Sequence, residues 1–127
     1  MQTVLARFTH LPPIIIAALG IVSVSAQTSV IQQGRSAVQR GESAAAIEIL
    51  EKAVAQNPQS AEAHFALGLA YGSKGQQSGV LAAAKYGPKA KVEFERTLAL
   101  NPQHSEARFG LVQFALSSEG EQFLVGQ

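Results

Sequence analysis

The chain has 127 residues and a nearly even charge, with 10 Lys and Arg against 9 acidic residues. This length fits one domain at most, and an Ala-rich composition without Trp favours helices over a strand-rich sandwich. Because positive and negative residues are nearly equal in number, the composition gives no electrostatic reason to expect binding to nucleic acid or to an anionic membrane surface, both of which need concentrated positive charge. The lack of Cys excludes disulfides, thiolate catalysis and a lipid-modified N-terminal Cys.

Residues 1–26 have the composition of a secretory signal peptide. Arg7 is followed by the apolar run PPIIIAALGIVSV and by small residues up to Ala26, with no acidic residue. We expect cleavage after Ala26 and a periplasmic or secreted mature protein. An uncleaved membrane anchor is the weaker alternative, because residues 14–24 cover barely half of the ~20 residues that a spanning helix needs.

Five helices are expected downstream of this segment. Pro58 and Pro102 follow the second and fourth helices, which cannot continue through proline. Ser60 is suited to cap the third helix. The predicted spans are 28–40, 43–56, 60–74, 88–100 and 104–117.

Two offsets reveal an internal repeat. The segment GRSAVQRG, residues 34–41, shares its two glycines with GLAYGSKG, residues 68–75, at an offset of 34 residues. The stretch NPQSAEAHF, Asn57–Phe65, returns 44 residues later as NPQHSEARF. One insertion of ten residues in the second copy, Gln76–Lys85, reconciles the two offsets. The repeated nonamer is therefore the junction between consecutive repeats.

A helix-turn-helix period of 34 residues is that of the tetratricopeptide repeat, and the sequence resembles that family residue by residue. The family pattern of Trp, Leu, Gly, Tyr, Ala, Phe and Pro falls in the second copy on His64, Leu67, Gly68, Tyr71, Ala90, Phe94 and Pro102. In the more degenerate first copy it falls on Val30, Gln33, Gly34, Ala37, Ala46, Leu50 and Pro58. His64 in place of Trp, Gln33 in place of Leu, and the insertion depart from the pattern. The resemblance covers about residues 27–117 and implies an all-α fold, a short right-handed solenoid of antiparallel helix hairpins.

The glycines in the middle of the first helices need a packing reason. Gly inside a helix costs about 0.5–1 kcal/mol relative to Ala, yet Gly34 and Gly68 occupy the same place in both copies. We expect the second helix of each hairpin to approach closely there, with Ala46 and Ala90 as its small counterparts.

The insertion Gln76–Lys85 is apolar and Ala-rich, so we expect it to be structured. It either extends one helix of the hairpin or forms a short helix of its own. Pro88 is then expected in the first turn of the next helix, where proline is tolerated.

A third copy begins at Ser105 and provides only a first helix, which is apolar on more than one side. Solenoids of this kind usually have three or more repeats with polar ends, and each uncovered large side chain would gain roughly 1.5–3 kcal/mol on burial. Three explanations account for this uncovered apolar surface. The C-terminal tail, residues 118–127, folds back over the helix, or two chains form a homodimer through residues 109–125. Otherwise the chain has lost later repeats that its relatives possess. We expect self-association or partner docking through residues 109–125.

No catalytic, cofactor-binding or metal-binding constellation is recognisable in the sequence. His64 and His104 are 40 residues apart with no Asp or Cys nearby, whereas a zinc site needs three or four ligands. We expect His64 to fill an inward position and His104 to be a surface residue at a helix start. The glycine-rich segments GLAYG and GSKG match no phosphate-binding pattern, and no nucleophile elbow is present.

The acidic pairs favour the same conclusion. Glu48 with Glu51 and Glu93 with Glu95 are expected on solvated helix faces. The sequence therefore predicts a protein that is not an enzyme.

The concave surface of stacked hairpins, lined by their first helices, is the expected binding site. By the geometry of the family, a mostly apolar stripe for a protein or peptide partner is formed by Ile31, Arg35, Glu62, Phe65, Leu69, Phe109 and Gln113. Phe65 and Phe109 would anchor the partner; alternatively, both are buried between helices and leave no groove. Family members that clamp a carboxylate use several cationic or amide side chains here, whereas this stripe has one cation, Arg35.

The sequence thus predicts an exported, non-catalytic adaptor. The alternative is a membrane-anchored assembly component of the cell envelope, held by an uncleaved N-terminal segment.

Overall fold

The computed structural model describes residues 25–125, with side chains described up to residue 118, so residues 1–24 of the expected signal segment lie outside the described residues. The described part consists of five helices and contains no strand. A helix over residues 25–39 is followed by α2 (Ser43–Gln56), α3 (Ala61–Gln77), α4 (Val80–Leu100) and α5 (Ser105–Val125). The all-α prediction is confirmed: two helix hairpins are followed by a single helix.

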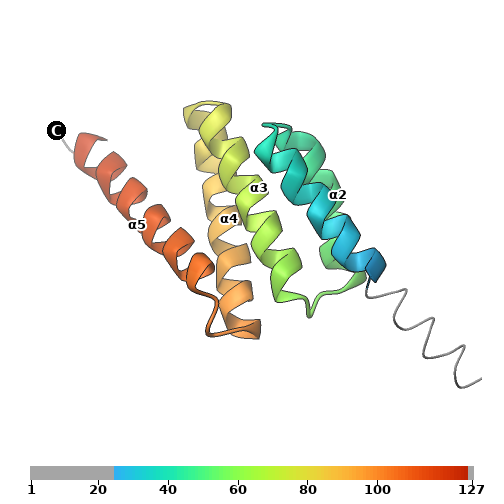
Figure 1. Cartoon of the computed structure of the whole chain (residues 1–127). Coiled ribbons are helices and arrows are strands. Elements are labelled where there is room, and N and C mark those ends of the chain that lie inside the picture. Colours follow the sequence, from blue (N-terminus) through green and yellow to red (C-terminus); the bar gives the residue numbers. More distant parts are fainter. Residues whose placement is uncertain (1–24, 126–127) are drawn as a thin grey trace, which may run out of the picture.

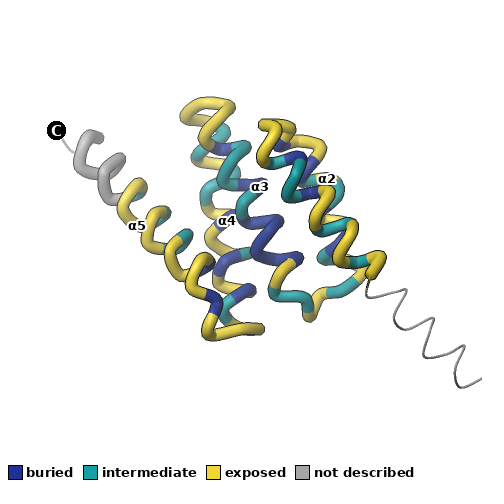
Figure 2. The backbone as a smooth tube through the Cα atoms, in the orientation of Figure 1, coloured by how far each residue is buried: buried dark blue, intermediate teal, exposed yellow. Residues whose placement is uncertain are grey.

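The helices form two layers (Figure 1). The helix over residues 25–39, α3 and α5 run in one direction, and α2 and α4 return behind them. α3 packs against both α2 and α4, and α5 packs against α4. Figure 2 shows the consequence for burial: α3 is the most deeply buried helix, whereas α5 is largely exposed.

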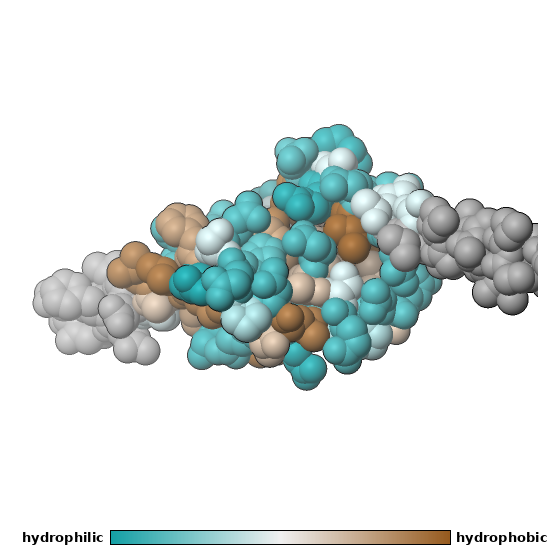
Figure 3. All heavy atoms as spheres, turned by 60° about the horizontal axis from the view of Figure 1, so that its bottom comes forward, coloured by the Kyte–Doolittle hydropathy of each residue, from teal (hydrophilic) through white to brown (hydrophobic). Residues whose placement is uncertain are grey.

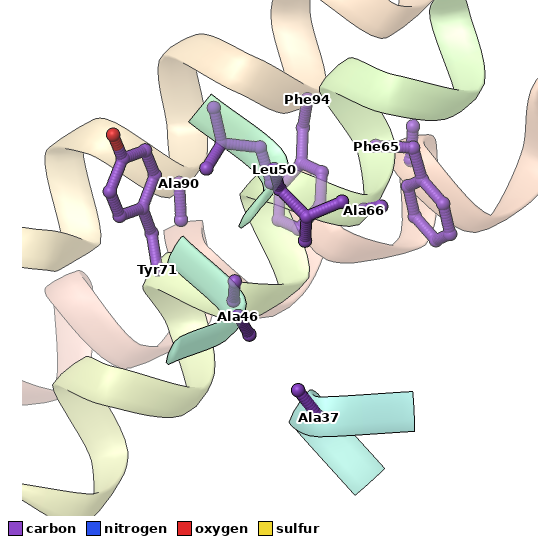
Figure 4. Close-up of a cluster of buried hydrophobic side chains, with 11 residues drawn as sticks. Ala37, Ala46, Leu50, Phe65, Ala66, Tyr71, Ala90 and Phe94 are labelled. Carbon is purple, nitrogen blue, oxygen red and sulfur yellow. The ribbon is translucent and has the colours of Figure 1, made fainter. Parts of the chain in front are cut away.

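A glycine notch in each first helix receives a large side chain from the second helix. A Cβ atom on Gly34 would lie 2.4 Å from Cγ of Leu50, and one on Gly68 would lie 2.6 Å from Cε1 of Phe94. Leu50 and Phe94 are both buried, and Figure 4 shows them within the core cluster. The close contact expected inside both hairpins is therefore confirmed, but the residues that meet the glycines are Leu50 and Phe94 and not the expected Ala46 and Ala90.

The repeated nonamer builds the same turn twice. In each copy the Asn side-chain oxygen accepts a hydrogen bond from the backbone amide two residues further on, at 3.3 Å between Asn57 and Gln59 and at 3.1 Å between Asn101 and Gln103. Asn side chains commonly form such local turns. The interpretation of the nonamer as a junction between repeats is therefore confirmed.

The insertion lengthens both helices of the second hairpin. α3 runs to Gln77 and α4 starts at Val80, so only a short turn separates them. Gly79 in this turn has a φ of 86°, a conformation that glycine adopts without strain. The inserted residues form neither a separate helix nor an extension of one helix alone.

Pro88 lies in the interior of α4, so the prediction that it occupies a first helical turn is wrong. Proline removes one helical hydrogen bond and collides with the Cβ of the residue before it. Here that residue is Gly87, which has no Cβ, and Pro88 lies on the exposed face, where water can bond the freed carbonyl. Gly87 also faces α5, since a Cβ there would lie 3.1 Å from the ring of Phe114.

α5 docks on α4 near its start and then leans away from it (Figure 1). Ala107 is fully buried, and a Cβ on Gly110 would lie 2.8 Å from the ring of Phe94. The helix reaches Val125, beyond the predicted end at residue 117. Residues 118–125 therefore continue the helix. Of the three explanations for the uncovered apolar surface, a tail that folds back over the helix is ruled out for these residues.

Two glycine-to-alanine substitutions one turn apart in α3 are expected to change stability in opposite directions. In Gly68→Ala the added methyl overlaps the Phe94 ring, and overpacking of about 1–3 kcal/mol exceeds the helical gain of about 0.5–1 kcal/mol. Nothing lies within 4 Å of a Cβ on Gly72, so Gly72→Ala keeps only the gain. Urea unfolding followed by circular dichroism measures both. Equal shifts in one direction would show that α3 and α4 do not meet at Gly68.

Candidate functional site

Two of the predicted site residues form a polar link between neighbouring first helices. Nη1 of Arg35, on the helix over residues 25–39, lies 3.8 Å from Oε2 of Glu62 on α3. Oε1 of Glu62 lies 3.3 Å from Nε2 of His104, just before α5. The Glu62 side chain is 55% exposed, so the link contributes little to stability. It does place charges of both signs on the layer where a partner is expected.

The two predicted anchor residues divide between core and surface. Phe65 is 3% exposed, and its ring lies between those of Phe94 and His104, at centroid distances of 5.9 Å and 4.4 Å. It is a core residue, so the prediction that it anchors a partner is corrected. Phe109 is its counterpart in the third copy and is 63% exposed. Phe65 is covered by α4, through Phe94, whereas no helix within the described residues covers Phe109 in the same way.

The remaining site residues are partly or fully accessible. Ile31 and Leu69 are partly buried against the core, on neighbouring first helices. Gln113 is exposed on α5, one turn beyond Phe109. The structure therefore gathers Ile31, Arg35, Glu62 and Leu69 on two adjacent helices, and it sets Phe109 and Gln113 on the helix that leans away.

His104 is buried, so the prediction of a surface residue is wrong. It is the N-cap of α5, as Ser60 is the N-cap of α3: Oγ of Ser60 accepts from the backbone N–H of Ala63 at 3.1 Å, and Nδ1 of His104 accepts from Ala107 at 3.2 Å. Because Nδ1 accepts, the ring proton is on Nε2, which faces Glu62. The equivalence of His104 with Ser60 in the repeat was the sequence signal for this role.

His64 points inward, as predicted, and has a partly buried partner that the sequence did not reveal. Its Nε2 donates to the carbonyl of Pro58 at 2.8 Å, since a carbonyl oxygen can only accept. Its Nδ1 lies 2.6 Å from Oε2 of Glu93. The Glu93 side chain is 17% exposed, so it is not on a solvated face. Both ring nitrogens of His64 therefore have a partner within the fold, and the contact with Glu93 links α3 to α4. We call this pair of contacts the His64 brace.

A shallow hollow of about 310 Å³ lies between α3 and α4, lined by Tyr71, Pro88, Lys89, Val92 and Glu93. The Tyr71 hydroxyl donates to Oε1 of Glu51 at 2.6 Å, and Nζ of Lys89 lies 5.4 Å from the centre of the Tyr71 ring. Burial, followed by the hydrogen bond to Glu51, raises the pKa of Tyr71 above its ordinary value. Within the described residues, no three His, Cys, Asp or Glu side chains are grouped to hold a metal ion.

A row of apolar side chains is exposed on α5. Phe109, Val112 and Leu116 are 63%, 50% and 60% exposed, and their spacing of three and four residues puts them on one face of the helix. We call these three residues the α5 stripe. Figure 3 shows apolar side chains gathered beside the grey C-terminal segment. Covering these three side chains would gain free energy, because burial of apolar area is favourable.

Residues 34–75 match the family model described as TPR repeat. The match covers about a third of the chain, from Gly34 through α2 to Gly75 in α3. Comparisons with curated proteins and with solved structures gave no match. Between residues 25 and 125, no helix has both the length and the hydropathy needed to cross a bilayer.

Alanine substitution of the two equivalent phenylalanines is expected to separate core from surface. Phe65→Ala empties a buried site and should cost about 3–5 kcal/mol. Phe109→Ala removes a mostly exposed ring and should stay within about 0.5 kcal/mol. Unfolding in urea at a protein concentration of about 1 μM, where weak association is negligible, compares them. A large loss in Phe109→Ala would mean that the ring is covered and the α5 stripe is not open.

Proposed function

We propose that the chain is a non-catalytic adaptor of the tetratricopeptide-repeat type, which the family match over residues 34–75 supports. Repeats of this family are protein-protein interaction modules, built from hairpins that present one layer of helices to a partner. The adaptor binds a protein or peptide on the layer formed by the helix over residues 25–39, α3 and α5. Ile31, Arg35, Glu62 and Leu69 provide mixed apolar and charged contacts, and Phe109 and Gln113 extend them.

The exposure of Phe109 carries this proposal. Phe65 and Phe109 occupy the same position of the repeat, and one is buried while the other is mostly accessible. A large aromatic side chain held on a rigid helix is typical of the residues that dominate protein interfaces. Two residue types that often act in catalysis, His64 and Tyr71, lie outside this surface, and their polar groups are hydrogen-bonded within the fold, which favours binding over catalysis.

Export is part of the proposal. The positive start, apolar run and small residues of the segment 1–26 support secretion and cleavage, which would release the adaptor into the periplasm or medium. In the alternative function the same segment stays attached and the chain is a membrane-anchored assembly component of the cell envelope.

The intact mass of the chain recovered from exporting cells distinguishes these two functions. The adaptor should have lost residues 1–26 and should appear in the soluble fraction. A full-length mass in the membrane fraction would contradict cleavage and support the anchored component.

A photo-crosslinking amino acid in place of Arg35 or Gln113 should capture the same partner protein in cells. Substitution of Glu48 or Lys91, exposed on α2 and α4 in the other layer, is the matched control and should capture it weakly or not at all. Mass spectrometry identifies the adducts. Equal capture from both layers, or adducts that contain only further copies of this chain, would refute an adaptor for other proteins.

A further inference from the structure

We propose that the α5 stripe is a homodimer interface, on which a second copy of the chain lays its own α5 in antiparallel orientation. This proposal rests on the proposed function, because it names one partner of the same layer of helices. The dimer would cover Phe109 and Gln113 at the end of the adaptor surface, whereas Ile31, Arg35, Glu62 and Leu69 lie on the other two first helices. A crosslinker at Arg35 therefore tests the adaptor separately from the dimer.

The repeat register shows which kind of element covers this face. Val112 is the counterpart of Gly34 and Gly68, the residues that face Leu50 and Phe94 of the second helices. Phe109 is the counterpart of Phe65, which packs against Phe94, so Phe109 and Val112 lie on the face that α4 covers in the second hairpin. Leu116 is the counterpart of Gly72, where a Cβ would have no neighbour within 4 Å. In both hairpins the covering helix runs antiparallel to the one it covers. An antiparallel helix is thus the occupant that this fold accommodates.

The size of the stripe residues rules out the close packing seen inside the hairpins. Val112 replaces Gly68 of the second copy, and even a single Cβ on Gly68 would lie 2.6 Å from the Phe94 ring. A helix that covers α5 must therefore lie farther away, with side chains from both helices interdigitating. A spacing of three and four residues is the pattern of such a seam. The covering helix is therefore more easily one with the same bulky stripe than the second helix of a further repeat. Such a second helix would insert a large side chain into a glycine notch, which α5 lacks at Val112.

The α5 stripe is complementary to a second copy of itself. A two-fold axis between Val112 and Gln113 places Phe109 opposite Leu116 of the second copy at both ends of the seam, about 10 Å apart along the helix. Gln113 then lies near the axis, where its amide can donate to and accept from its counterpart. None of these four side chains is charged, so two copies do not repel one another across the seam.

Sedimentation equilibrium of the full chain, as recovered from expressing cells, tests the proposal between about 1 and 200 μM. The wild type should show a monomer-dimer equilibrium with a Kd in the tens of micromolar, as expected for a small interface. Val112→Lys should weaken it at least about tenfold, because it sets two like charges close to the axis. Val92→Lys is the matched control, since Val92 is 47% exposed on α4 and Val112 is 50% exposed on α5; it should dimerise like the wild type.

Circular dichroism of both variants establishes that they remain folded. A wild type that stays monomeric throughout would overturn the dimer and leave the adaptor function standing. A dimer that Val112→Lys leaves intact, or that both lysine variants weaken equally, would also overturn it. The adaptor fails separately, if a crosslinker at position 35, which lies outside the dimer seam, captures no other protein.

Discussion

The insertion of one large side chain into a glycine notch is the contact on which the rest of this molecule depends. Leu50 enters the notch at Gly34, and Phe94 enters the notch at Gly68. Helical glycine is unfavourable by about 0.5–1 kcal/mol, whereas full burial of a Leu or Phe side chain gains about 1.5–3 kcal/mol, so the net balance favours the hairpin. The notch also fixes the distance between the two layers. Phe94 further meets Gly110 of α5, so a single ring positions the helix that begins the third copy.

A second constraint is polar and acts where the family pattern has a tryptophan. His64 takes that place and is braced by Glu93 and the Pro58 carbonyl, so a hydrogen-bonded ring replaces a large apolar one. Buried polar pairs of this kind contribute less to net stability than to the choice of one packing arrangement, because other arrangements leave a group unpaired. We infer that the His64 brace fixes the register of α4 on α3.

Contacts that occur in both copies of the repeat could be predicted from the sequence, whereas contacts that occur only once could not. The two offsets predicted the hairpins, the junction turn and the glycine notches, because each of these recurs at a fixed position. Pro88 was misplaced because its tolerance depends on Gly87 and on the exposure of that face of α4. His104 was misplaced because histidine is a rare N-cap, although its equivalence with Ser60 was visible. Phe65 and Phe109 could not be distinguished, since their burial depends on whether a second helix packs beside them.

This last difference shifts the expected binding surface from the groove toward the end of the solenoid. The groove was predicted to be anchored by two phenylalanines, yet Phe65 is used to pack α3 against α4 and against His104. What remains of the groove is partly buried and carries an exposed ion pair, which contributes little free energy. The end carries three exposed apolar side chains on α5, which α4 contacts at Gly110 and Phe114 and from which it diverges (Figure 1). Because burial of apolar area dominates association, the proposed adaptor would gain most of its binding free energy where a partner covers α5, and the two hairpins would be the rigid base of that helix.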